Sequence, residues 1–284
     1  MAKVTIHCVR HAEGFHNLSL ANHSIADPLL TPTGKAQCRT LSQTFPSPSK
    51  ITHLISSPLR RTLYTTLLSF PTAIARGLKI LALAELQETS SLPCDTGSSL
   101  SALTSEFSHG EYADTVDFRY VSSDWNSKTG RWSPAAHCIE RRARAARVFI
   151  RAVAEQSLAL YPDRDVDIVV VTHGGYLHYL TDDWDGAGKF VGTGWANTEV
   201  RRYGFVGLEG EGEGEEAFRG SMEGIRGGRE REEASLRETR ESRFGRLGAE
   251  IELGREEQRT LRDAVEREWC ESGYQGPREE SAKL

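Results

Sequence analysis

The sequence predicts an α/β fold built around a largely parallel sheet, and its apolar runs are the main observation behind this prediction. Short runs of apolar and β-branched residues recur over residues 4–9, 51–56, 80–84 and 166–171, and such runs are typical of strands. The last run is apolar apart from Asp167, as expected for a central parallel strand that is buried on both faces. Segments suited to helices lie between the runs, and parallel strands need such crossovers.

Helix signals support this alternation. Thr31 is a suitable N-cap with Pro32 at the first helical position, and the helix is expected to run to about Phe45. The longest helix is predicted from Pro134 to about Tyr161, and its cluster of arginines is interpreted as a solvated face.

Two further segments complete the predicted body of the protein. The pattern weakens over residues 100–133, which are rich in aromatic residues, and we expect this segment to form a cap over the site. Residues 194–205 are expected to form a last loop and an edge strand.

The composition changes after the body. Residues 207–228 are a low-complexity linker of Gly and Glu, and residues 229–284 mix Glu and Arg at helical spacing. The chain is thus predicted to hold one domain over residues 1–206, followed by a linker and a charged helical extension.

Composition narrows the class of protein. The 284 residues are enough for one substantial domain with its own core. The net charge of −5 argues against a general nucleic-acid binder. Residues 207–284 carry 14 Lys and Arg against 21 Asp and Glu, whereas residues 1–206 carry 21 against 19, so the body can still attract an anion.

The cysteines and the termini bear on localisation. Five scattered cysteines without a C-x-x-C pair are typical of reduced intracellular thiols. The N-terminus has no signal-peptide pattern, and no apolar stretch is long enough to cross a bilayer. We therefore expect a cytoplasmic protein that does not interact with membranes.

Histidines stand at the ends of two predicted strands. Arg10 and His11 end the first strand, and His173 ends the fourth and precedes Gly174 and Gly175. The carboxyl ends of parallel strands line the ligand crevice of open α/β folds. An imidazole whose far nitrogen is held by an acceptor can act as a nucleophile, and a guanidinium binds phosphoryl oxygens. A lone His173 would usually be a core residue, but the combination predicts a phosphoryl-transfer site. His178 is given no functional role.

Two other segments offer groups for the same chemistry. The second strand turns directly into a helix that begins near Arg60 and Arg61, and a helix N-terminus attracts anions. The two side chains diverge by about 100° on a helix, so only one is expected to point inward. Glu85 and Glu88 follow the third strand, and a partly desolvated carboxyl group near a phosphate can hold a proton at neutral pH. The serine-rich loop over residues 90–99 is expected to face the substrate.

Taken in order, these segments resemble the histidine phosphatase superfamily, also called the phosphoglycerate mutase-like family. The resemblance starts with the spacing of Arg10, His11, Glu13 and Asn17, with Ala12 in place of the commoner glycine. It continues through three more blocks, which are Ser57-Pro58-Leu59-Arg60-Arg61, Leu86-Gln87-Glu88 and Val171-Thr172-His173-Gly174-Gly175. It covers roughly residues 3–205 and implies a three-layer α/β/α fold with a mostly parallel sheet.

The resemblance also implies a mechanism that uses neither a metal nor a cofactor. His11 attacks phosphorus, and Glu88 protonates the departing alkoxide, with Glu85 as the alternative acid. Arg61 is the phosphate ligand in preference to Arg60, and His173 acts in catalysis with His11. The phosphate-binding residues implied in this way are Arg10, Asn17, Arg61, His173 and Gly174. The predicted function is therefore hydrolysis of a small phosphorylated metabolite through a phosphohistidine.

Two alternatives stay open at this point. A phosphoglycerate-type mutase would need a basic cluster for the carboxylate of its substrate, but Arg119, Lys128 and Arg131 are dispersed along the sequence. The chain could instead be a catalytically silent binding module that recruits a protein partner through its charged extension. Because all the matched catalytic positions are present, hydrolysis is the preferred prediction, and the extension is expected to have no catalytic role.

Overall fold

A seven-stranded sheet with the order β4-β3-β2-β5-β1-β6-β7 forms the centre of the molecule. The computed structural model describes residues 2–187, 193–206, 234–248 and 252–276. The strands are β1 (Val4–Arg10), β2 (Ile51–Ser56), β3 (Ile80–Leu83), β4 (Val116–Tyr120), β5 (Val166–Thr172), β6 (Val200–Phe205) and β7 (Leu236–Glu238). Strands β1 to β5 are parallel, β6 runs antiparallel to β1, and β7 runs antiparallel to β6. The predicted mostly parallel sheet is confirmed.

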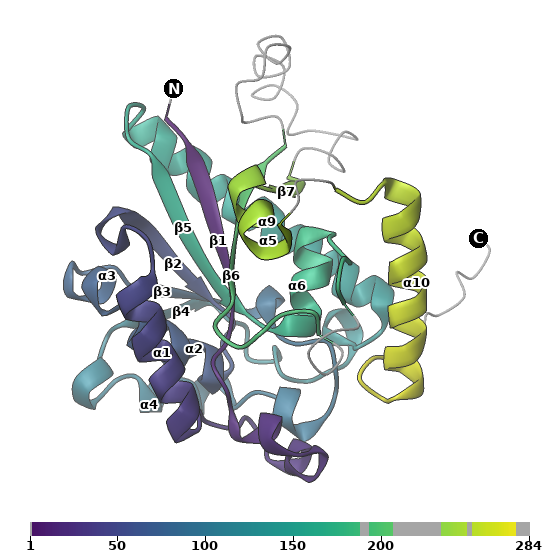
Figure 1. The fold of residues 1–284 in the computed structure, drawn as a ribbon. Coiled ribbons are helices and arrows are strands. Elements are labelled where there is room, and N and C mark those ends of the chain that lie inside the picture. Colours follow the sequence, from purple (N-terminus) through teal and green to yellow (C-terminus); the bar gives the residue numbers. More distant parts are fainter. Residues whose placement is uncertain (1, 188–192, 207–233, 249–251, 277–284) are drawn as a thin grey trace.

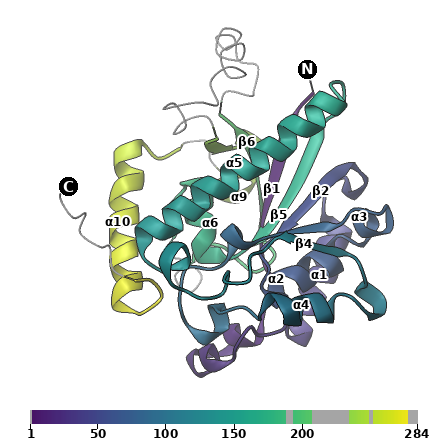
Figure 2. The same ribbon diagram turned by 180° about the vertical axis from the view of Figure 1, so that it is seen from behind.

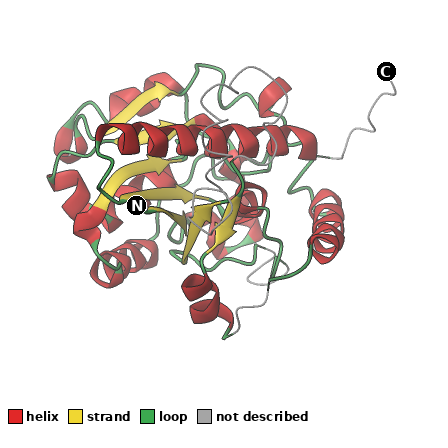
Figure 3. Cartoon of the chain, turned by 90° about the horizontal axis from the view of Figure 1, so that it is seen from above, coloured by secondary structure: helices red, strands yellow, loops and turns green. Residues whose placement is uncertain are grey.

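Helices cover both faces of this sheet (Figure 1, Figure 2). The α-helices are α1 (Pro32–Thr44), α2 (Arg60–Ser69), α3 (Pro71–Ala75), α4 (Leu100–Glu106), α5 (Ala136–Leu160), α6 (Gly174–Thr181), α9 (Arg240–Leu247) and α10 (Arg255–Glu271). The side chain of Thr31 accepts a hydrogen bond from the amide of Gly34, which confirms the predicted N-cap of α1. The long helix α5 runs across one face of the sheet (Figure 3).

The central strand β5 shows how the layers are held together. Ile168 and Val170 belong to the core that includes α5 and α6, whereas Val169 and Val171 belong to the core that includes α1 and α2. Side chains alternate between the two faces of a strand, so a run of consecutive apolar residues supports a core on each side. The three-layer α/β/α fold expected from the resemblance is therefore confirmed.

Residues 100–133 do not form the predicted cap. They contribute α4 and the edge strand β4, which pairs parallel with β3. The aromatic residues of this segment that pack inside, Phe107, Trp125 and Trp132, are buried in the core with α1 and α2. The alternation within β4 is weak because an edge strand is only partly buried, and this weak pattern explains why the strand was missed.

The described part of the charged extension contains the helices α9 and α10, as predicted, and also the strand β7. Strand β7 pairs with β6, so β6 is not the edge strand that the sequence predicts. An unpaired strand edge offers free backbone groups, and pairing with it outweighs the local preference for helix. The linker predicted over residues 207–228 lies outside the described residues.

Helices α9 and α10 are joined to the body by buried polar contacts. Arg243 of α9 donates to Asp183 at 3.3 Å, and the hydroxyl of Tyr179 on α6 donates to Glu266 of α10 at 2.9 Å. Figure 1 and Figure 2 both show α10 on the side of the molecule away from α1 and α2. In the described part of the chain, no helix combines the length and the apolar character needed to cross a membrane.

Candidate active site

A cavity of about 600 Å³ opens at the carboxyl ends of the parallel strands. Its floor is formed by Arg10, His11 and Arg61, and its walls come from residues 13–23, the loop over residues 88–95 and the C-terminal extension. Segments far apart in the sequence thus meet at one edge of the sheet. None of residues 100–133 lines this cavity, in contrast to the cap that the sequence predicts.

His11 follows the last residue of β1 and is buried at the floor of the cavity. Its Nδ1 atom lies 2.7 Å from the carbonyl oxygen of Ala12. A carbonyl oxygen can only accept, so Nδ1 carries the proton and Nε2 keeps its lone pair. The side-chain Nδ2 of Asn197 donates to the carbonyl oxygen of His11 at 2.9 Å and fixes its backbone. Burial, followed by the charge of Arg61, lowers the pKa of His11 well below its ordinary value of 6.5. The imidazole is therefore neutral at neutral pH.

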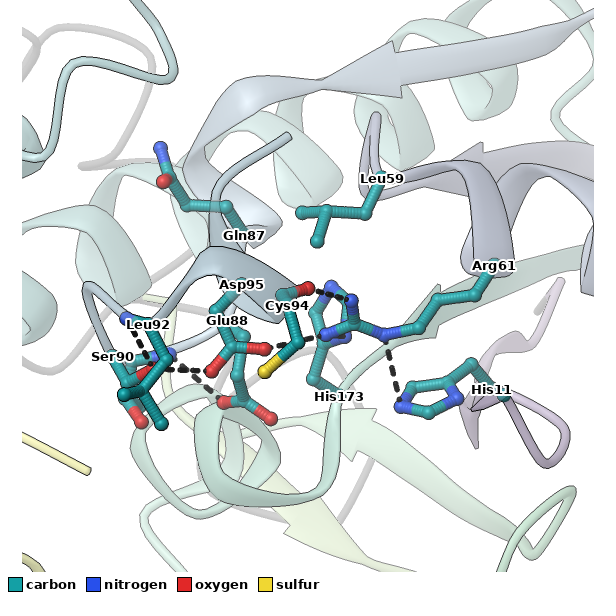
Figure 4. A network of polar contacts seen from close by, with 12 residues as sticks. His11, Leu59, Arg61, Gln87, Glu88, Ser90, Leu92, Cys94, Asp95 and His173 are labelled. Carbon is teal, nitrogen blue, oxygen red and sulfur yellow. Dashed lines mark hydrogen bonds and ion pairs between the residues drawn. The ribbon is translucent and has the colours of Figure 1, made fainter. Parts of the chain in front are cut away.

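Arg61 connects the two histidines (Figure 4). Its Nε atom donates to Nε2 of His11 at 3.3 Å, and Nη2 donates to Nδ1 of His173 at 3.0 Å. Nη1 donates to the carbonyl oxygen of Cys94 at 2.5 Å, and Nη2 also forms an ion pair with Asp95 at 2.8 Å. The guanidinium is fully buried, so its position is set by four acceptors from three parts of the chain.

Arg60 points away from the cavity. Its guanidinium forms an ion pair with Glu106 at 2.9 Å. The amide of Arg60 at the start of α2 donates to a carboxylate oxygen of Asp27 at 3.0 Å. The sequence predicts that this helix start attracts the phosphate, but the first amide of α2 is taken by Asp27. The guanidinium of Arg61 is the group that α2 brings to the site.

His173 lies beneath this guanidinium and is fully buried. Its ring centroid lies 5.2 Å from that of His11. Because Nδ1 accepts from Arg61, Nε2 carries the proton, and it lies 2.9 Å from the hydroxyl oxygen of Ser57. Both ring nitrogens thus have protein partners, and these contacts support a role in holding Arg61. The direct contact with phosphoryl oxygens remains a prediction.

Arg10 and the glycines of α6 pack closely together. Nη1 of Arg10 donates to the hydroxyl of Thr193 at 3.0 Å and to the carbonyl oxygen of Trp195, and burial lowers the pKa of Arg10 to about 10. A Cβ atom on Gly174 would lie 2.7 Å from the Cβ of Thr193 and 3.2 Å from Nε of Arg10. Gly174 therefore permits this packing, while Gly175 is the glycine that borders the cavity.

Asn17 lies at the rim of the cavity. Its Oδ1 atom accepts a hydrogen bond from the amide of Gly14 at 3.0 Å. This contact closes the turn η1 (Phe15–Leu18) that directly follows the His11 segment. The structure thus gives Asn17 a role in shaping the loop, and its contact with phosphate remains a prediction.

Glu88 lines the cavity, whereas Glu85 does not. Oε1 of Glu88 accepts from the amides of Thr89 and Tyr176, each at 2.9 Å. Burial is the main cause that raises the pKa of Glu88 above its ordinary value, and the nearby carboxylate of Asp95 raises it further. Glu85 instead pairs with Arg131 outside the cavity. Of the two candidate acids, only Glu88 is placed to protonate a group bound there.

The backbone that carries Glu88 is held by a buried arginine of α5. Arg142 donates to the carbonyl oxygens of Glu85 at 3.0 Å, Gln87 at 2.7 Å and Glu88 at 3.3 Å. The sequence predicts that the arginines of this helix form a solvated face, but Arg142 is only 3% exposed. Its long side chain reaches past the helix surface to the loop, a direction that helical periodicity alone does not reveal.

Asp95 and His16 were not identified as site residues from the sequence. Asp95 belongs to the loop that is expected to face the substrate, and the structure shows that it pairs with Arg61 and accepts from the hydroxyl of Ser90 at 2.5 Å. The ring of His16 lies 5.3 Å from that of His11, and burial lowers its pKa to about 2. The position of His16 next to Asn17 in the matched block is the one sequence signal that could have found it.

The C-terminal extension supplies two further residues of the cavity wall. Trp269 of α10 and Tyr274, which follows α10, both line the cavity. The sequence predicts that this extension has no catalytic role, and it gives no sign that the extension reaches the cavity. Its contribution became apparent only from the packing of α10 against the body.

This arrangement defines a class of protein, namely an α/β protein with a candidate phosphoryl-binding site at the carboxyl edge of its sheet. The family model described as histidine phosphatase superfamily (branch 1) matches residues 6–207. The chain therefore belongs to this superfamily, as its resemblance predicts, and this membership supports a phosphatase-type enzyme. No curated protein matches the chain.

The chain is similar to several solved structures. Ecdysone phosphate phosphatase from Bombix mori, solved with tungstate, is 13% identical with a TM-score of 0.50, and the match covers 71% of this chain and 89% of that one. Phosphoglycerate mutase from Bacillus anthracis is 17% identical with a TM-score of 0.43 and coverage of 71% and 88%. A mutant of phosphoserine phosphatase from Entamoeba histolytica, solved with phosphoserine, is 17% identical with a TM-score of 0.39 and coverage of 72% and 91%. Of these three, the ecdysone phosphate phosphatase structure reaches a TM-score of 0.50, and at 13% identity it supports a shared fold alone.

Proposed function

We propose that the protein is a phosphomonoester hydrolase that forms a phosphohistidine on His11. The observation that carries this proposal is the state of the His11 ring. Nδ1 is held by the carbonyl oxygen of Ala12, and burial keeps the ring neutral. Nε2 is therefore unprotonated, and its lone pair, which accepts a hydrogen bond from Nε of Arg61 at 3.3 Å, is the one that attacks phosphorus when the phosphoryl group takes the place of this contact.

In the first step, Nε2 of His11 forms a bond to phosphorus while the bond from phosphorus to the ester oxygen breaks. Arg10 and Arg61 bind the phosphoryl oxygens and offset the negative charge that develops. Arg61 already contacts Nε2 of His11, so a phosphoryl group at this nitrogen lies within its reach. His173 holds Arg61 in place, and Asn17 and Gly174 shape the surrounding backbone.

Glu88 supplies the proton that the departing oxygen needs. Its raised pKa favours the protonated form, and proton donation of this kind contributes about 10²–10⁴-fold to a rate. In the second step the same carboxylate takes a proton from water, the water oxygen bonds to phosphorus, and the bond to Nε2 breaks. Inorganic phosphate leaves, and none of these steps uses a metal ion.

The test is rapid quenching of the purified protein with a ³²P-labelled aryl phosphate in the presence of EDTA. The wild type is expected to release phosphate and to carry a base-stable, acid-labile label. His11→Ala is expected to lose both the label and turnover because the nucleophile is absent. His109→Ala is the matched control, since His109 is an exposed imidazole remote from the cavity, and it is expected to keep both. Label that persists on His11→Ala would refute the assignment of the nucleophile.

A further inference from the structure

We infer that the outer part of the cavity binds a bulky apolar or aromatic leaving group that carries no second anionic group. This inference rests on the proposed phosphatase function and adds a substrate class to it. The surface that carries it is called the outer wall and consists of Leu20, His23, Leu92, Trp269 and Tyr274, all of which line the cavity.

The first argument is that the C-terminal part of the outer wall has a fixed position. The hydroxyl of Thr89, next to Glu88, donates to the carbonyl oxygen of Tyr274 at 3.3 Å. The amide of Gly276 donates to the carbonyl oxygen of Pro134 at 2.9 Å. Trp269 is buried within the core that includes α5 and α6. The short segment from Trp269 to Gly276 is thus held at both ends, and its side chains are preorganised to contact a ligand.

The second argument is that aromatic and apolar groups face one another around the cavity. The ring of His23 meets the ring of Tyr274 edge to face at a centroid distance of 5.8 Å. His23 belongs to η2 (Leu20–Ser24), and Tyr274 follows α10 at the other end of the chain. The two rings thus form one continuous part of the wall, and a flat group bound against this pair would bury apolar surface and meet ring faces and edges.

The third argument comes from the exposed side chains beside the cavity. Residues 15–25 hold four large apolar side chains that are 40% exposed or more, namely Phe15, Leu18, Leu20 and Ile25. Leu20 is the most exposed of them at 71%, and it lines the cavity. Phe15, Leu18 and Ile25 do not line the cavity, so Leu20 is the exposed apolar side chain of this segment that a bound leaving group can contact.

The fourth argument is the distribution of charge. Among the described residues that line the cavity, Arg10 and Arg61 are the only Arg or Lys side chains, and the proposed mechanism uses both at the phosphorus. Glu13, Glu88 and Asp95 line the same cavity. A carboxylate or a second phosphate on the leaving group would find no further guanidinium or ammonium on the cavity wall and would approach these acidic residues. The same distribution disfavours a mutase acting on a phosphorylated sugar acid.

Lys128 is a basic side chain near this cavity that does not line it. Burial lowers its pKa to about 7, and the charges of Asp95 and Glu88 act in the opposite direction. Because Lys128 does not line the cavity, a leaving group bound there makes no direct ion pair with its ammonium group.

The test compares substrates that share a phosphate group but differ in the leaving group. We expect kcat/KM for 1-naphthyl phosphate to exceed that for 3-phosphoglycerate by at least about 100-fold. Tyr274→Ala and Leu20→Ser are each expected to lower kcat/KM for 1-naphthyl phosphate about tenfold, mainly through KM, because each removes one apolar contact. Ethyl phosphate is too small to reach the outer wall. In the same two variants, kcat/KM for ethyl phosphate is therefore expected to change less than about twofold.

The matched control is Phe244→Ala. Phe244 is an exposed aromatic residue of α9, in the same C-terminal extension, and it does not line the cavity. This variant is expected to keep wild-type kinetics on both substrates. A preference for 3-phosphoglycerate, or equal losses on both substrates in Tyr274→Ala and Leu20→Ser, would overturn the inference.

A binding experiment separates this inference from the proposed function. Calorimetry with 1-naphthylmethylphosphonate and with phosphonoacetate measures affinity without turnover, and it can use His11→Ala. The naphthyl compound is expected to bind at least about tenfold more tightly, with the difference lost in Tyr274→Ala. If this preference holds but the wild type shows no phosphohistidine, only the proposed function fails. If phosphohistidine forms without the preference, only the present inference fails.

Discussion

Replacing Arg142 with Met tests whether a residue that does not line the catalytic cavity positions the general acid. The three carbonyl oxygens of Glu85, Gln87 and Glu88 would lose their charged donor. A buried acceptor left without a partner costs about 1–3 kcal/mol. Removal of the buried charge, whose desolvation already lowers the pKa of Arg142, offsets part of this cost. We therefore expect the free energy of unfolding to fall by about 3 kcal/mol, measured by urea denaturation.

The effect on catalysis follows from the place of Glu88 on the same loop. A displacement of about 1 Å in a catalytic group can cost about 100-fold in rate, and we expect a loss of this size with an alkyl phosphate. p-Nitrophenyl phosphate has a leaving group that needs no proton, so its hydrolysis is expected to fall less than about tenfold. The assay is kcat for the two substrates at the same pH.

Arg141→Met is the matched control because Arg141 is the exposed neighbour of Arg142 on α5. It is expected to leave both stability and the ratio of the two rates unchanged. Arg142→Lys, which keeps the charge with fewer donors, covers the case in which Arg142→Met folds poorly. Equal losses on the two substrates in folded Arg142 variants would refute the positioning role.

Two predictions concern pH. Activity of the wild type on an alkyl phosphate is expected to fall as pH rises through the raised pKa of Glu88, because the ionised carboxylate has no proton to donate. Glu88→Gln is expected to remove this alkaline limb, and an unchanged limb would rule out Glu88 as the acid. Burial holds the pKa of His16 near 2, so below pH 6.5 the unfolded chain binds a proton that the folded chain does not. His16 therefore lowers stability by about 1.4 kcal/mol for each pH unit of acidification. His16→Asn is expected to reduce the pH slope of urea denaturation by this amount between pH 6 and pH 4, and an unchanged slope would contradict the assigned burial.

Some parts of the structure could be predicted because their signals are local. The strands β1 and β5 are rich in apolar and β-branched residues, since both are buried on both faces, and Thr31 followed by Pro32 marks the start of α1. The edge strands β4 and β7 could not be predicted in this way. Such strands are stabilised by pairing with a neighbour more than by their own residues, and the neighbour is not visible in the local sequence.

The sequence by itself determined the family, the parallel core and the segments that carry His11, Arg61, Glu88 and His173. It did so because each of these residues follows a strand or begins a helix, and the carboxyl ends of parallel strands meet at one edge. Only the tertiary structure decided how the side chains pair within the cavity and which distant segment completes it. Arg142 reaches the loop of Glu88 across 54 residues of sequence, and the C-terminal extension reaches the cavity from the far end of the chain. Contacts of this kind depend on packing between elements, and no periodicity within either element records them.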